Sequence, residues 1–180
     1  MGRLAIIAAK GSQPRLLAHA ARAAGEIPFI IGLNNQVDAD FSDFEYLEIP
    51  VGQIGALLDS LAERDIQKIC LSGKFVRPSL HTLKPDSHAV KLISKALFSG
   101  DDKALKIVRN FFEERGFQMV PETDYLRLDT LSSGEIFGPP LSDGQHKAVA
   151  TGIDALYQRG ALDVGQCIIT HKHRVIAIEG

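Results

Sequence analysis

The chain has 180 residues, of which 45% are hydrophobic and 23% are charged. This balance is that of a soluble globular protein with enough apolar material for a core, and it excludes an intrinsically disordered chain. The net charge is −2, from 20 basic and 22 acidic residues, and the lack of a basic excess argues against nucleic-acid binding. No apolar stretch is long enough to span a bilayer, and residues 1–11 lack a secretory signal. We therefore expect a cytoplasmic protein that acts on a small or amphipathic molecule and binds no nucleic acid.

Apolar runs of strand length alternate with helical patterns through the first half of the chain. In chain order we expect a strand at 3–9, a helix at 15–24, strands at 27–33 and 46–50, a helix at 54–64 and a strand at 66–71. Near-continuous apolar strands that alternate with helices predict a parallel sheet covered on both faces. The first half is therefore predicted to be a Rossmann-like α/β unit.

The pattern changes beyond Gly73. We expect helices at 85–98 and 101–115, a strand at 117–120 that completes the sheet, a helix at 143–159 and a hairpin of strands at 166–170 and 174–178. Residues 134–143 carry two glycines and Pro139-Pro140, which marks them as the clearest linker. The predicted fold is α/β, with a Rossmann-like N-terminal domain at 1–133, then a linker and the start of an incomplete second α/β domain at 134–180.

The two cysteines, Cys70 and Cys167, each lie in an apolar, strand-like run. Neither belongs to a paired framework of the kind that disulfide-rich secreted domains show. We therefore expect two buried free thiols in a reducing cytoplasm.

The first strand leads into its helix through Lys10-Gly11-Ser12-Gln13. In a parallel sheet, ligands bind beyond the carboxyl ends of the strands, and helix N-termini offer free amides to phosphate. Gly11 permits close backbone approach, Ser12 or Gln13 caps the helix or contacts a ligand, and Lys10 supplies charge. An ordinary tight turn explains these residues equally well, because neither GxGxxG nor GxxxxGK[ST] is present.

A second basic loop, Ser72 to Pro78, follows the strand at 66–71 and is expected on the same edge of the sheet. Lys74 and Arg77 are placed there to meet an anion, and Gly73 leaves room for it. Solvated loop charges are the usual explanation for any one such pair. Two basic loops on one edge favour a phosphate site.

Acidic residues elsewhere allow two interpretations. Asp101-Asp102 begins a predicted helix, where carboxylates cap free amides, although two carboxylates also suit Mg²⁺. Adjacent helical side chains diverge, which favours capping. Asp163 and Gln166 flank Gly165 at a predicted turn. Either this turn faces a ligand, or Asp163 only stabilises the turn.

Four segments together resemble UDP-2,3-diacylglucosamine pyrophosphatases of the LpxI type. They are LAIIAAKGSQPRLLAHAARAAG, LSGKFVRPSLHTLKPD, SGDDKALKIVRNFFEERGF and GALDVGQCIITHKHRVIAIEG. The resemblance covers essentially the whole chain in collinear order. Each motif is weak alone, but the combination of GK-V-RP, GDD and LD-GQ is fairly specific.

The resemblance implies a two-domain, Mg²⁺-dependent hydrolase of lipid A biosynthesis in the cytoplasm, with peripheral contact at the inner membrane. Its substrate is UDP-2,3-diacylglucosamine, and its products are UMP and 2,3-diacylglucosamine 1-phosphate. Apolar surface between the domains would hold the acyl chains. The substrate-binding residues that it implies are Lys10, Gly11, Ser12, Gln13, Gly73, Lys74, Val76, Arg77, Asp101, Asp102, Asp163, Gly165 and Gln166.

Two departures from the family pattern matter. Family members carry a run of glycines after the first strand, where this chain has Ala9-Lys10-Gly11. The family also continues past AIE into acidic motifs of the second domain, whereas this chain stops about two thirds of the way along the usual length. The catalytic residues and metal ligands are therefore expected beyond residue 180, and this chain by itself is expected to be inactive or weakly active.

The main alternative is a non-catalytic α/β module that binds a nucleotide or another anion at the same sheet edge. An NAD-binding domain fits less well, because residues 32–34 are Gly-Leu-Asn where an acidic residue is expected after the second strand. The open strand edges of the C-terminal hairpin leave a homo-oligomer as an option.

Overall fold

The computed structural model describes residues 2–78, 83, 85–96, 100–126, 138–159 and 167–179. The chain divides into two compact units, Met1–Phe98 with Leu105–Leu128, and Ser99–Ala104 with Asp129–Gly180. The predicted domain boundary at 133–134 falls outside the described residues. In chain order the elements are β1 (Arg3–Ala8), α1 (Gln13–Ala23), β2 (Ile27–Leu33), β3 (Glu45–Ile49), α2 (Ile54–Ala62), β4 (Lys68–Ser72), α3 (Ser87–Ala96), α4 (Asp101–Glu113), β5 (Gln118–Met119), the 3₁₀ turn η2 (Glu122–Asp124), α5 (Asp143–Arg159), β6 (Ile168–His171) and β7 (Arg174–Ile178).

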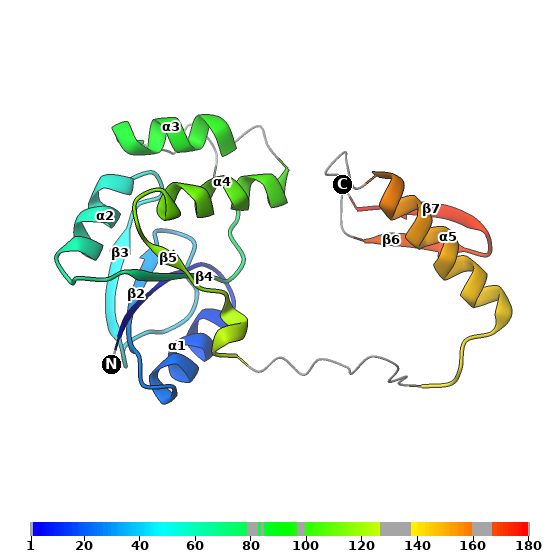
Figure 1. The fold of residues 1–180 in the computed structure, drawn as a ribbon, viewed down its shortest axis with the longest axis horizontal. Helices are drawn as coiled ribbons and strands as arrows, with labels where there is room; N and C mark the ends of the chain where they lie inside the picture. Colours follow the sequence, from blue (N-terminus) through cyan, green and yellow to red (C-terminus); the bar gives the residue numbers. More distant parts are fainter. Residues whose placement is uncertain are drawn as a thin grey trace. The chain divides into compact units, whose positions relative to one another are not determined.

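The first unit is built on a five-stranded parallel sheet with the order β3-β2-β1-β4-β5 (Figure 1). β1 lies at the centre, where Ala8 at its carboxyl end pairs with Gly32 of β2 on one side and with Ser72 of β4 on the other. The chain moves outward from β1 to β3 and then returns to the other side for β4 and β5. This confirms the predicted Rossmann-like α/β fold.

Both faces of the sheet are covered, as the apolar strands predict. The face toward α1 buries one cluster, formed by Leu4, Ile6, Ala8, Leu17, Ala18, Ala21, Ile30, Phe41, Cys70 and Val120. The opposite face, toward α2 and α4, buries a second cluster, formed by Ala5, Ile7, Phe29, Ile31, Ile49, Leu57, Leu61, Ile66, Ile69 and Phe112. Alternate residues of β1 therefore enter alternate clusters, which fixes the orientation of the strand ends that follow.

α3 adds an outer layer that is tied to α2 by one carboxylate. Asp86 accepts hydrogen bonds from the backbone N–H of Gly55 in α2, at 2.6 Å, and of Ala89 in α3, at 2.8 Å. The same side chain therefore caps the start of α3 and fixes it against the neighbouring helix. None of the helices in the described part of the chain is long and apolar enough to cross a bilayer.

The second unit places α5 against an antiparallel hairpin of β6 and β7. The approach is close at Gly152, where an added Cβ would lie 3.2 Å from Thr170 Cγ2 and 3.3 Å from Ile168 Cγ2. Much of the apolar surface of this unit is exposed, including Ile176 of β7 at 63% and Tyr157 of α5 at 83%.

The expectation of two buried thiols is right for Cys70 and wrong for Cys167. Cys70 lies on the central sheet beneath α1, and its side chain is fully buried. Cys167 is exposed just ahead of β6. The apolar run around Cys167 indicates a strand correctly, but a two-stranded hairpin covered by one helix buries few of its residues.

Candidate functional site

The strand order reverses between β1 and β4, so their carboxyl ends lie side by side at the centre of the sheet. In open α/β sheets this reversal leaves a crevice outside the strand ends, where ligands bind. The two loops that the sequence singles out, Lys10 to Gln13 and Gly73 to Arg77, leave from these two strands. The prediction that they share one edge of the sheet is confirmed.

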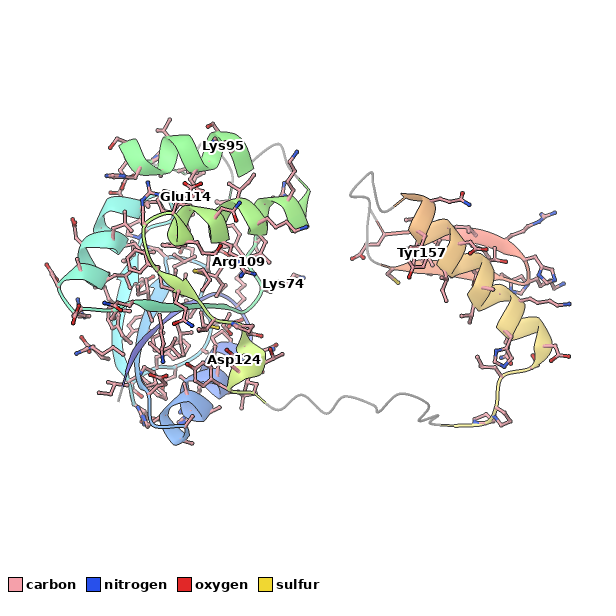
Figure 2. All side chains as sticks on the ribbon, in the orientation of Figure 1. Lys74, Lys95, Arg109, Glu114, Asp124 and Tyr157 are labelled. Atoms are coloured by element: carbon pink, nitrogen blue, oxygen red, sulfur yellow. The ribbon has the colours of Figure 1, made fainter. Side chains whose placement is uncertain are left out.

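The two loops are joined through their backbones. Lys10 and Lys74 form an antiparallel bridge, in which Lys74 N donates to Lys10 O at 2.8 Å and Lys10 N donates to Lys74 O at 3.3 Å. Gly73 makes this approach feasible, because its φ is +93° and an added Cβ would lie 2.8 Å from Lys10 O. Both lysine side chains are exposed, and neither ammonium group forms an ion pair with a described residue. Figure 2 shows Lys74 just beyond the carboxyl end of β4.

The first loop presents backbone N–H groups at the start of α1. Ser12 occupies the N-cap position without a side-chain capping bond, and the first turn carries no acidic residue. Gly11 has a φ of +105°, and a Cβ there would meet no atom of the described chain within 4 Å. The Gln13 side chain is exposed, and its Nε2 donates a hydrogen bond to Glu122 Oε2 of η2 at 2.8 Å. The loop thus has room for an anion at the amides of α1.

The second loop is held by a residue that sequence reasoning missed. Gln36, in the connection from β2 to β3, is buried with 6% of its surface exposed. Its Oε1 accepts from Val76 N and its Nε2 donates to Val76 O, both at 2.9 Å. The side chain of Val76 remains exposed, as does that of Arg77. Gln36 therefore fixes the backbone of the loop that carries Lys74 and Arg77.

Two more polar residues at this edge were not singled out from the sequence. Asp38 Oδ1 accepts a hydrogen bond from Gly11 N at 2.8 Å. Ser72, at the end of β4, is only 5% exposed, and its Oγ has no hydrogen-bond partner in the described part of the chain. The available signal was strand order: a loop after β2 neighbours the loop after β1 whenever β2 and β1 pair in parallel.

Five of the predicted site residues are not tested by the described part of the structure. Asp101 and Asp102 form the first turn of α4, and their side chains lie outside the described residues. Asp163, Gly165 and Gln166 lie outside the described residues altogether. Their proposed contacts with a ligand stay predictions.

The described residues do not by themselves assign a Mg²⁺ site. No group of three or more His, Cys, Asp or Glu side chains gathers in the described ranges in a way that could hold a metal ion. The two carboxylates nearest the first loop, those of Asp38 and Glu122, already accept hydrogen bonds from it. The magnesium requirement that the resemblance implies therefore stays a prediction without assigned ligands.

Comparison with known proteins bears on this arrangement directly. Residues 3–128 match the LpxI N-terminal domain, and this range is more than half of the chain. The chain belongs to the LpxI N-terminal domain family. The match spans β1 to η2, so both basic loops of the candidate site lie within the part that defines the LpxI family here.

A relative extends the LpxI similarity over the rest of the chain. It is named UDP-2,3-diacylglucosamine pyrophosphatase LpxI, comes from Caulobacter vibrioides, and is 26% identical over 183 aligned residues. The alignment covers 99% of this chain but 65% of the relative. The chain thus spans less than two thirds of the length of this LpxI protein. The predicted resemblance to the LpxI family is confirmed.

Proposed function

We propose that this chain is the nucleotide-binding part of a UDP-2,3-diacylglucosamine pyrophosphatase of lipid A biosynthesis. The full reaction would hydrolyse the pyrophosphate of UDP-2,3-diacylglucosamine to UMP and 2,3-diacylglucosamine 1-phosphate. Membership of the LpxI family and the name of the Caulobacter relative support this substrate. In this proposal the residues of the first unit supply the binding site for the nucleotide.

One observation carries the proposal: the backbone bridge between Lys10 and Lys74 at the reversal point of the sheet. It joins the loop that leads into α1 to the loop after β4, and each loop carries an exposed lysine whose ammonium group has no ion-pair partner in the described chain. A diphosphate needs cationic groups and N–H donors that converge on its oxygens. Ser72 Oγ adds a buried hydroxyl on the same edge that lacks a described partner.

Binding is tested first with UDP alone, by titration calorimetry on the wild-type chain. The double variant Lys10→Gln/Lys74→Gln is expected to raise the Kd for UDP by about tenfold or more, since hydrogen bonds to charged groups contribute about 1.5–3 kcal/mol each. Arg109→Gln is the matched control, because it removes one exposed cation that pairs with Glu113 within α4. An unchanged Kd in the double variant would contradict the site.

Turnover is tested by incubating the chain with UDP-2,3-diacylglucosamine and Mg²⁺ and following UMP by mass spectrometry. UMP that disappears with EDTA would place the catalytic groups within these 180 residues. UDP binding without UMP release would favour the alternative function, a nucleotide-binding module that does not itself hydrolyse the substrate. Contact with the inner membrane is a separate prediction, tested by co-sedimentation with anionic lipid vesicles.

A further inference from the structure

The aspartate that meets the first loop carries a charge of the same sign as a phosphate group. Asp38 Oδ1 accepts from Gly11 N at 2.8 Å, so a negative charge lies beside the loop that is proposed to receive a diphosphate. The side chain is exposed, and its Oδ2 has no partner in the described part of the chain. A carboxylate there repels phosphate, and its presence therefore points to a different part of the ligand.

The order of the strands indicates which part of the ligand the Asp38 carboxylate would contact. In dinucleotide-binding sheets, an acidic residue that follows the second strand hydrogen-bonds the ribose hydroxyl of the nucleotide. Here residues 32–34 are Gly-Leu-Asn, so the acid is missing from the strand end itself. The connection from β2 to β3 instead returns to the glycine of the β1–α1 loop and places Asp38 there.

The donor and acceptor chemistry of the edge agrees with this assignment. An ionised carboxylate only accepts hydrogen bonds, and a ribose diol offers two hydroxyl donors. The cationic and N–H groups of the same edge, at Lys10, Lys74 and the start of α1, suit the phosphates. On the same edge, Ser72 Oγ is buried without a hydrogen-bond partner in the described part of the chain. Ser72 follows Cys70 by two residues, so its side chain lies on the face covered by α1.

We propose that Asp38 binds the ribose hydroxyls of the uridine nucleotide and makes the site selective for ribonucleotides. This assignment rests on the proposed function, that the two basic loops bind UDP. Gly11 N holds one carboxylate oxygen in place, and the other oxygen faces the ligand. The 2′-hydroxyl is one of the two donors, so its removal weakens binding only while the carboxylate is present.

The test compares the Kd of UDP with that of 2′-deoxy-UDP by calorimetry. The wild-type chain is expected to prefer UDP by about tenfold to a hundredfold, the range for a hydrogen bond to a charged group. Asp38→Ala is expected to bring the ratio of the two Kd values close to 1. Asp38→Asn keeps an acceptor for Gly11 N and is expected to give a ratio between these two values.

Asp40→Asn is the matched control. It removes the same charge from the same connection, but the Asp40 carboxylate bonds to Ser42 N and Oγ rather than to the first loop. Its ratio is expected to equal that of the wild type. A general loosening of the loop would weaken the binding of both nucleotides equally and leave the ratio of their Kd values unchanged. The ratio therefore distinguishes ribose binding from a purely structural role of Asp38.

Three outcomes would overturn the assignment. A wild-type ratio retained in Asp38→Ala would mean that Asp38 only supports the loop. Tighter binding of UDP by Asp38→Ala, with an unchanged ratio, would mean that the carboxylate competes with phosphate for Gly11 N. If the wild-type chain binds neither nucleotide, the proposed function is overturned as well. If it binds UDP and 2′-deoxy-UDP equally well, only the assignment of Asp38 is overturned.

Discussion

The carboxamide of Gln36 and the backbone of Val76 exchange two hydrogen bonds, each 2.9 Å long, across 40 residues of sequence. Gln36 is buried, and both of its polar atoms are used in this pair. The connection from β2 to β3 therefore acts as a support for the candidate site, since it also reaches the first loop through Asp38 and Gly11.

Removal of the Gln36 carboxamide is expected to destabilise the first unit. Gln36→Ala leaves the N–H and C=O of Val76 without these partners, and the free energy of unfolding should fall by about 1–3 kcal/mol in urea titrations. Gln67→Ala changes an exposed glutamine and should stay within about 0.5 kcal/mol of the wild type. Equal effects of the two substitutions would contradict the supporting role of Gln36.

Gly73 is expected to tolerate no side chain. Gly73→Ala combines an unfavourable φ of +93° with a Cβ 2.8 Å from Lys10 O, whereas Gly25→Ala has a similar φ of +90° and no described atom within 4 Å of the Cβ. The unfolding free energy should therefore fall by about 1–2 kcal/mol in Gly25→Ala, and by clearly more in Gly73→Ala. The comparison isolates the close contact between the loops, and equal losses would show that the loops do not meet there.

The two cysteines are expected to react at very different rates. Cys167 is exposed, and Cys70 is fully buried in the sheet core. Iodoacetamide at pH near 8 should therefore modify Cys167 in the native chain and leave Cys70 unmodified until the protein unfolds. Peptide mapping by mass spectrometry gives the readout, and urea-unfolded protein labelled at both positions is the control. Native labelling of Cys70 would contradict its burial.

Alkaline pH is expected to destabilise the first unit. Burial, and next the charges of Glu122 and Asp124, raise the pKa of the Cys70 thiol from its ordinary value of 9.0 to about 12. The unfolded thiol thus loses its proton at lower pH than the folded one, so this contribution is complete below pH 9 and is lost as the pH rises toward 12. Burial, and next Glu26, also raise the pKa of Tyr125 to about 12, with the same sign.

Substitution of Cys70 separates these two contributions. Unfolding free energies of Cys70→Ala and the wild type, measured from pH 8 upward, should show a shallower alkaline decline in the variant. Some decline should remain, because Tyr125 titrates in the same direction. Parallel pH profiles for the two proteins would mean that the thiol does not contribute.

Two glycines of α5 are expected to respond differently to the same substitution. Gly144→Ala meets no described atom within 4 Å and should stabilise the helix by a few tenths of a kcal/mol up to about 1 kcal/mol. Gly152→Ala places a Cβ 3.2–3.3 Å from side-chain atoms of β6, so crowding should cancel that gain or reverse it. Amide hydrogen exchange of α5 measures both effects, and equal protection in the two variants would argue against the packing of α5 on the hairpin.

Local sequence patterns were sufficient to predict the elements of the first unit and the edge of the sheet on which its basic loops lie. Apolar strands that alternate with amphipathic helices predict a parallel sheet covered on both faces, and all strands of such a sheet end on the same side. That reasoning needs only local patterns, and it placed β2 at 27–33 without error. It also sufficed to select Lys10 and Lys74, since each lies two residues beyond the end of a strand.

The contacts between the loops, in contrast, depend on the order of the strands in the folded sheet. The order β3-β2-β1-β4-β5 makes β1 and β4 neighbours, brings Lys10 against Lys74, and turns the connection after β2 back onto both loops. Gln36 and Asp38 read as ordinary loop residues in the sequence, because their partners are 40 and 27 residues away. Burial of Cys70 and exposure of Cys167 were decided in the same way. Local periodicity sets what each segment becomes, whereas contacts between distant segments depend on how the strands are ordered, and no local pattern encodes that order.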